Sequence, residues 1–269
     1  MKKNFIFLAV SLFFLLPQLA LAQSAKIIGL RGKVMVRQQE SAPWKKAKIN
    51  MALDKNAEIE TKENANCTLS FDQARKNVVT MKSSSYLKLD SVKPADLYLK
   101  EGRVFTLIEN LQKSEKFQIR TPTAIAGARG TGWGTDFHNN QTGVMCFENT
   151  IFTNGLDNSG NPTGEQDVDS GNGLDIGPGG VMGGLFNLDE ADYEEWDDFL
   201  GYLEDLKNNE AGNDDFNEED ALQDARDEQR EDYGDFMGED RRRDAMGGES
   251  SHEESPEPPE PPSYEDTER

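Results

Sequence analysis

Histidine and cysteine, which often carry catalysis and metal binding, are scarce in this sequence of 269 residues. It has only His138 and His252, and only Cys67 and Cys146. No HExxH, CxxC or cysteine–histidine cluster is present, which removes the usual zinc and redox motifs. Since His252 lies in the C-terminal tail, a Ser-His-Asp or Cys-His site would depend on His138 alone. We therefore expect a protein that is not an enzyme and has no cofactor.

Long apolar runs are missing after the N-terminus. Lys2 and Lys3 precede the apolar run Phe5–Leu16, which is too short to span a bilayer comfortably. A cleavage site of the A-x-A type ends at Ala22. The pattern predicts a signal peptide, residues 1–22, that is cleaved after Ala22, and a periplasmic or secreted bacterial protein. Because no later segment has about 18 consecutive apolar residues, no membrane span is expected in the mature chain.

Basic residues are concentrated in one part of the chain. The net charge is +7 over residues 23–150, −5 over 151–180 and −25 over 181–269. Such asymmetry indicates an acidic C-terminal region, which repels nucleic acid and anionic membranes. We expect this region to act on the basic domain of its own chain or on a basic partner.

Short runs with a period of two residues dominate from Ile27 to about Ile151. Val34 and Val36 alternate with Met35 and Arg37, and turn-forming residues separate this run from the next. Strands at such spacing, without helical patterns between them, predict an all-β sandwich or rolled β structure. We place this β domain at residues 23–180.

The chain is organised around one glycine-rich stretch, RTPTAIAGARGTGWGTDF, residues 120–137. It joins a strand signal to a turn and then to another strand. Its spacing fits neither a Walker loop nor the dinucleotide pattern G-x-G-x-x-G, so we expect a structural turn rather than a nucleotide site. Gly127 and Gly130 are expected where φ is positive or where another backbone comes close. The proposed signature consists of Arg120, Thr121, Pro122, Gly127, Arg129, Gly130 and Thr131.

This stretch resembles the signature of FecR-type domains, in which a TP step is followed by a glycine-arginine-glycine-threonine turn. Further segments resemble that domain in order: GKVMV, MALDKNAEIET, CTLSFDQARKNVVTM, SSYLKL, LYLKEGRVFTLI and GNGLDIGPGG. The resemblance covers about residues 25–180 and departs from the family pattern over Phe147–Ser170. It implies an extracytoplasmic, all-β sensory or interaction module, known from regulators of iron-siderophore uptake. Those regulators carry a cytoplasmic helical segment before a membrane span. Here the apolar run begins at Phe5, so a direct anti-sigma role is not expected.

The pattern changes to a helical period after Gly180. Apolar residues recur every three or four positions among acids, which predicts one amphipathic acidic helix, to which we assign residues 181–207. Its stripe, which either docks on the β domain or binds a partner's groove, includes Trp196, Phe199, Leu200 and Leu203. Residues 208–269 are acidic, end in a proline-rich segment and have few large apolar residues. This composition predicts a disordered tail.

Two features leave alternatives open. Cys67 and Cys146 either form a disulfide, as an exported chain allows, or remain two buried thiols. Asp157, Asp167 and Asp169 lie among Asn and Gly as in a calcium loop, although the EF-hand spacing is not met. They are weak metal candidates.

The sequence thus predicts an exported, non-enzymatic binding, scaffold or sensory module that engages an envelope protein, a glycan or a small ligand. The alternative is an extracytoplasmic hydrolase or calcium-dependent binding protein that uses loop carboxylates such as Glu148. Trp44 and Trp133 could stack on a sugar, but aromatic residues in strand regions more often belong to the core.

Overall fold

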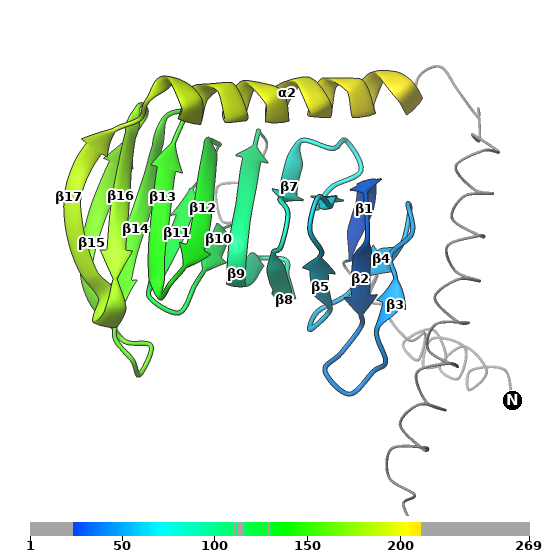
Figure 1. Ribbon diagram of the computed structural model, residues 1–269, viewed down its shortest axis with the longest axis horizontal. Coiled ribbons are helices and arrows are strands. Elements are labelled where there is room, and N and C mark those ends of the chain that lie inside the picture. The colour runs from blue at the N-terminus through cyan, green and yellow to red at the C-terminus, as the bar shows by residue number, and fades with distance from the viewer. Residues whose placement is uncertain (1–23, 110, 112–115, 129, 211–269) are drawn as a thin grey trace, which may run out of the picture. The chain divides into compact units, whose positions relative to one another are not determined.

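The computed structural model describes residues 24–109, 111, 116–128 and 130–210. They contain 17 β-strands and one α-helix (Figure 1). The predicted signal peptide, Arg129 and the tail beyond residue 210 lie outside the described residues. None of the helices described is long and apolar enough to cross a bilayer.

The strands form two sheets, which we call sheet A and sheet B. In spatial order, sheet A contains β4 (Ala52–Leu53), β1 (Ala25–Arg31), β6 (Asn66–Ser70), β7 (Asn77–Met81), β9 (Ala95–Ile108), β12 (Gly132–His138), β13 (Gln141–Cys146), β16 (Asn172–Gly177) and β17 (Val181–Asn187). Sheet B contains β3 (Lys45–Lys46), β2 (Val34–Arg37), β5 (Glu58–Thr61), β8 (Tyr86–Val92), β9, β10 (Phe117–Arg120), β11 (Ala124–Ala128), β14 (Thr150–Leu156) and β15 (Pro162–Asp169). The 3₁₀ turn η2 (Pro178–Gly180) connects β16 to β17.

Strand β9 belongs to both sheets. Its first part pairs with β8 and, in parallel, with β10 of sheet B, whereas its second part pairs with β7 and β12 of sheet A. The strand changes sheets near Gly102, where φ is +96°. A Cβ at this position would lie 2.5 Å from Cα of Ser85, so both the backbone conformation and the space require glycine.

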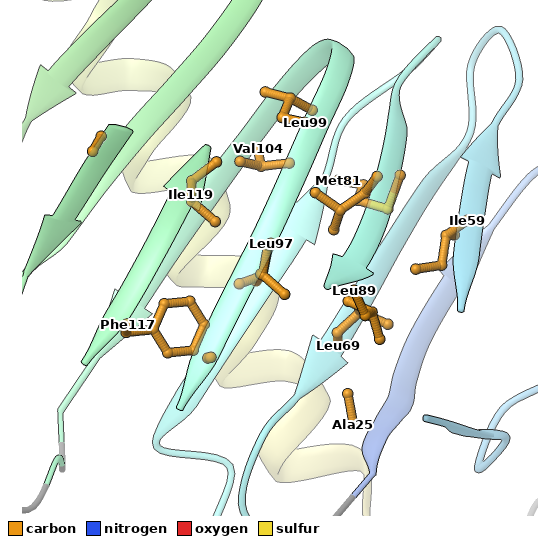
Figure 2. Close-up of a cluster of buried hydrophobic side chains, with 14 of the residues drawn as sticks. Ala25, Ile59, Leu69, Met81, Leu89, Leu97, Leu99, Val104, Phe117 and Ile119 are labelled. Atoms are coloured by element: carbon orange, nitrogen blue, oxygen red, sulfur yellow. The ribbon is translucent and has the colours of Figure 1, made fainter. Parts of the chain in front are cut away.

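The main core lies between the two sheets and consists of alternate residues of their strands, as the period of two predicts. Figure 2 shows part of it, where Leu97 and Val104 of β9 lie among side chains of neighbouring strands. Trp133 is fully buried in this core, and its indole nitrogen donates to Thr135 Oγ1 at 3.1 Å. The core reading of Trp133 therefore holds, and it is not accessible to a sugar.

The outer face of sheet A is covered by helix α2 (Glu190–Glu210), which runs across the strands from the side of β17 toward β1 (Figure 1). Three helix residues, Trp196, Phe199 and Leu203, are buried in a second apolar cluster, and Leu200 packs against its edge. The sheet contributes Ile28, Val78, Phe105, Leu107, Met145 and Phe147 to this cluster. The predicted apolar stripe thus docks on its own β domain.

Aromatic contacts and glycines shape this interface. Trp196 stacks on Phe147, with ring centroids 4.5 Å apart and planes at 4°, and meets Phe105 edge-on at 5.8 Å. Beneath it lies Gly132 of β12, where a Cβ would approach Cη2 of Trp196 to 2.5 Å. Since no real Cβ tolerates that distance, the absence of a side chain at Gly132 makes room for the tryptophan.

Ion pairs flank the same interface. Glu195 of α2 lies 2.5 Å from Arg103 of β9 and 3.2 Å from Lys82, which directly follows β7. Arg103 also pairs with Asp136 at 3.2 Å. The helix part of the acidic region therefore contacts basic residues of its own domain, as the charge asymmetry predicts. The remainder, beyond residue 210, lies outside the described residues.

The helix begins where its sequence provides a cap. The Asp189 carboxylate accepts from the Asp192 backbone N–H at 3.1 Å, and the Asp192 carboxylate accepts from the Asp189 N–H at 2.9 Å. The predicted all-β fold followed by one helix is confirmed. The boundary placed at Gly180 is displaced, because residues 181–187 form strand β17, and the helix starts only at Glu190.

Candidate functional site: the outer face of sheet B

A row of polar and aromatic side chains crosses the outer face of sheet B. Cross-strand register places Arg37 of β2, Glu58 of β5, Lys88 of β8, Tyr98 of β9 and Arg120 of β10 side by side. Each is flanked along its strand by residues that point into the core. The row is therefore the outward half of the same alternation that builds the core.

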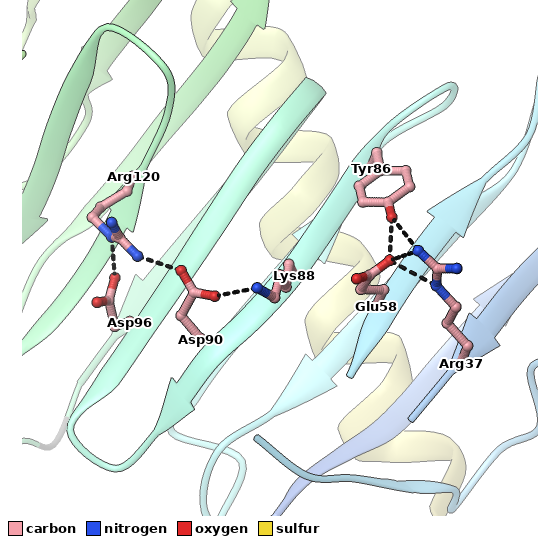
Figure 3. A network of polar contacts seen from close by, with 7 residues as sticks. All are labelled: Arg37, Glu58, Tyr86, Lys88, Asp90, Asp96 and Arg120. Carbon is pink, nitrogen blue, oxygen red and sulfur yellow. Dashed lines mark hydrogen bonds and ion pairs between the residues drawn. The ribbon is translucent and has the colours of Figure 1, made fainter. Parts of the chain in front are cut away.

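At one end of the row, Glu58 accepts hydrogen bonds from two neighbours (Figure 3). Arg37 Nε and Nη2 lie 2.8 and 2.5 Å from Glu58 Oε2, and the Tyr86 hydroxyl donates to the same oxygen. Burial alone would raise the pKa of Glu58, but the hydrogen bonds from Tyr86 and Arg37 outweigh it and lower the pKa. The Arg37 guanidinium also lies 4.7 Å from the ring centre of Trp44, whose ring meets Tyr86 edge-on at 6.0 Å.

A second cluster surrounds Arg120 (Figure 3). Its Nε lies 2.8 Å from Asp96, its Nη2 pairs with Asp90, and Lys88 approaches Asp90 at 3.1 Å. The guanidinium also lies 5.9 Å from the ring centre of Tyr98. Two carboxylates and one ring hold the Arg120 side chain in place, so this face is ordered before any partner arrives.

A pocket of about 400 Å³ opens on the same side, beside Tyr86. Its lining includes Glu60, Lys62 and Lys100, and the Lys100 ammonium lies 4.9 Å from the ring centre of Tyr86. The site thus combines aromatic rings, cations and paired carboxylates on a rigid sheet, an arrangement suited to recognition.

The threonines of the signature turn, Thr121 and Thr123, make hydrogen bonds within the fold. Thr121 N–H donates to the Ala124 carbonyl at 2.9 Å, and the Thr121 hydroxyl is 2.6 Å from that of Thr142. Thr123 is also 2.6 Å from Thr142, so three buried hydroxyls join the β10–β11 turn to β13. Pro122 forms the bend between these threonines.

The remaining signature residues serve different purposes. Gly130 has φ +72°, as expected for a turn glycine. Gly127 does not have a positive φ; a Cβ there would approach Cζ of Phe152 to 2.5 Å, so close packing is what requires glycine. The Thr131 hydroxyl donates to the Glu148 carbonyl. Arg129 lies outside the described residues.

The two cysteines are free and buried, and they are not bonded to each other. Cys67 lies on β6 and Cys146 on β13, and three strands of sheet A, β7, β9 and β12, separate them. Four strand spacings of about 4.8 Å place the two backbones far beyond the reach of a disulfide. Burial raises the pKa of Cys67 to about 12 and that of Cys146 to about 11. The disulfide alternative is thereby wrong, because it depended on a strand order that sequence does not reveal.

The weak calcium candidates do not converge. Asp157 lies at the tip of the β14–β15 hairpin, where its carboxylate accepts from the backbone N–H groups of Ser159 and Asn161, each at 2.8 Å. Those hydrogen bonds, from Asn161 first, lower its pKa. Asp167 and Asp169 lie near the other end of β15, and Asp169 accepts from Thr150 at 2.7 Å. Within the described residues, no group of three His, Cys, Asp or Glu is placed to hold a metal.

Sequence reasoning singled out Arg120 and Trp44 but missed Arg37, Glu58, Tyr86, Asp90 and Asp96. The signal was available in part, because each of these residues alternates with a core residue in a predicted strand. What could not be known is the order of the strands in sheet B, which brings residues far apart in sequence into one row.

Comparisons with known proteins found a family model and solved structures that are similar to parts of this chain. The family model described as FecR protein matches residues 57–152, from β5 into β14. Two solved structures from Parabacteroides distasonis ATCC 8503, both named as anti-sigma factors, are similar to this chain. One, at 2.50 Å resolution, is 11% identical with a TM-score of 0.39, and the match covers 49% of this chain and 59% of that one. The other, at 1.65 Å, is 12% identical with a TM-score of 0.41, and the match covers 52% and 63%.

The chain thus spans less than two thirds of the length of either of these structures. No curated protein matches it. The family match, by contrast, contains most of the row on sheet B and the whole signature turn. The resemblance found in the sequence is confirmed in that residues 57–152 of this chain match the model of the FecR family.

Proposed function

We propose that this protein is an exported, non-enzymatic FecR-like regulatory or sensory module that binds another protein of the envelope or extracellular space through the outer face of sheet B. One observation carries the proposal. Helix α2 covers the outer face of sheet A, whereas no described element covers the outer face of sheet B. The A-x-A site that ends at Ala22 supports export.

The chemistry of the face favours a protein partner. Trp, Tyr and Arg are the residues most enriched where protein interfaces contribute most of their binding energy. Here Trp44, Tyr86 and Tyr98 are partly exposed, and arginines held by carboxylates lie beside them. Because these side chains are already held, binding would cost little side-chain entropy.

The test is capture from an envelope extract with the immobilised mature full-length chain, followed by mass spectrometry. Lys100→Glu places a negative charge at the pocket beside Tyr86 and should reduce capture of the specific partner several-fold. Lys26→Glu is the matched control, since Lys26 is equally an exposed lysine but lies on β1 of sheet A. Capture should be unaffected by this control.

The expected pattern is a small set of proteins retained by the wild type and by Lys26→Glu but lost with Lys100→Glu. If both variants retain the same proteins, the partner binds elsewhere and the assignment of the site to sheet B is wrong. If no protein is retained by the wild type from any envelope fraction, the proposal of a protein partner fails.

A further inference from the structure

Strand β17 leaves one edge of sheet A open. Among the strands described, β17 pairs with β16 on one side and with none on the other. Natural proteins commonly protect such edges with charged residues, proline or bulges. The sequence of β17, VMGGLFN, has no charged residue and no proline, although the strand contains one bulge. Its outer backbone N–H and C=O groups are therefore available to another strand.

The same strand exposes apolar side chains. Three of the five exposed large apolar residues in the described part of the chain lie on β17: Val181 at 68%, Leu185 at 50% and Phe186 at 39%. Leu185 lies opposite Leu174, which is fully buried, so the two share the core-facing side of sheet A. A further strand beside β17 would extend the core over Leu185.

A bulge divides the edge into two short segments. The register shifts between Leu174 and Ile176, so Gly183 and Gly184 of β17 lie opposite the single residue Asp175 of β16. A Cβ at Gly184 would meet nothing within 4 Å, so the bulge is open to solvent. Leu185 and Phe186 follow the bulge directly and, with Asn187, form the longer usable segment of the edge.

Charge identifies the chemistry of the partner. Residues 130–206 contain no Lys or Arg and 16 Asp or Glu. Asp175 lies on the adjacent strand β16, opposite the bulge of β17, and Asp189 follows the end of β17 by two residues. An edge-to-edge pair of two copies would bring these like charges together, whereas a basic segment would be attracted.

We propose that the β17 edge binds an extended polypeptide segment in which Lys or Arg alternates with apolar residues, and that this segment adds to sheet A as its next strand. Backbone hydrogen bonds would supply affinity, while Leu185 and the surrounding carboxylates would select the side chains. This inference deepens the proposed function, on which it rests only for the existence of a protein partner. It places a second contact away from sheet B.

The test uses a labelled synthetic peptide of about eight residues that alternates Lys with Val, and a twin with Glu in place of Lys. Fluorescence anisotropy with the mature full-length chain should show binding of the basic peptide alone. A rise from 50 to 500 mM salt should weaken that binding by about tenfold, because screening acts on the flanking carboxylates. Leu185→Lys should weaken it at least about fivefold, through lost apolar contact and added repulsion.

Ile49→Lys is the matched control, because Ile49 is 48% exposed but lies outside β17. It should bind the basic peptide as the wild type does. Val181→Lys is a second variant at the edge in case Leu185→Lys unfolds, which circular dichroism would reveal.

Three outcomes would overturn the inference: equal binding of both peptides, no binding of the basic peptide at millimolar concentration, or equal loss of binding in Ile49→Lys. A dimer seen by light scattering that is abolished by Leu185→Lys would also overturn it, since a second copy would then occupy the edge. Lys100→Glu should leave peptide binding unchanged. Failure of the peptide-binding experiment would therefore leave the proposed partner site on sheet B intact. Failure of the capture experiment with Lys100→Glu would likewise leave the proposed peptide site on β17 intact.

Discussion

Replacing Trp196 with Ala measures how strongly α2 is held on sheet A. The Trp196 side chain is buried, stacks on Phe147, meets Phe105 edge-on and fills the space left by Gly132. Truncation of a buried tryptophan typically costs about 3 to 5 kcal/mol, from lost burial and from the cavity that remains. Aromatic pairs of this geometry contribute about 0.5 to 1.5 kcal/mol beyond burial, so we expect a loss near the upper end of that range.

The assay is urea denaturation of the mature full-length chain, followed by far-UV circular dichroism. Tyr193→Ala is the control on the same helix, because Tyr193 is an exposed aromatic residue that meets the Phe147 ring at 78°, with centroids 5.9 Å apart. It should cost about 1 kcal/mol or less. If α2 undocks before the sheets unfold, Trp196→Ala will instead produce an early helical transition that is absent from the control. Losses below about 1 kcal/mol with no early transition would refute the view that α2 is integral to the fold.

Three further predictions concern the core and its polar contacts. Gly132→Ala should destabilise the protein by about 1 to 3 kcal/mol in the same assay, because the added Cβ would overlap the ring of Trp196. The control is Gly164→Ala, which should leave the stability unchanged, because the atom nearest to an added Cβ there is 3.8 Å away. Glu58→Gln should lower the free energy of unfolding by about 1 to 3 kcal/mol at pH 7. Because the folded-state pKa of Glu58 is lowered, the difference in stability between wild type and variant should be complete above the ordinary carboxylate pKa and should vanish as the pH falls through the folded-state pKa. A stability difference that does not change with pH would contradict this prediction. Cys67 and Cys146 should react with a thiol reagent only after unfolding, since burial raises both pKa values, and rapid labelling of the native protein would disprove their burial.

Local patterns in the sequence were sufficient for the type of most elements, although not for strand β17. Alternation such as that of Val34 and Val36 identified strands and their inward faces, and the spacing of Trp196, Phe199 and Leu203 identified the helix and its buried side. These predictions succeeded because period and burial are properties of a few neighbouring residues.

Properties that depend on strand order could not be predicted. Glu58 finds Arg37 and Tyr86 only because β5 lies between β2 and β8, and Cys67 misses Cys146 because three strands intervene. The boundary at Gly180 failed for a related reason. The pairing of β17 with β16 outweighs a glycine-rich composition that by itself indicates a loop.

Both sheets are laid down almost in the order of the chain, from β1 and β2 at one end to β15 and β17 at the other, with β9 in the middle (Figure 1). Each hairpin therefore finds its partner strand among segments that precede it closely. A polypeptide that becomes available from its N-terminus could assemble strand by strand, each new pair using the last as a template, without waiting for distant segments. Because α2 comes last and crosses strands from β1 to β13, its docking would complete assembly only after the whole row exists. A chain truncated before Glu190 would lack Trp196 and would leave Phe105 and Phe147 uncovered on the outer face of sheet A, so the docked helix is present only when the chain is complete through α2.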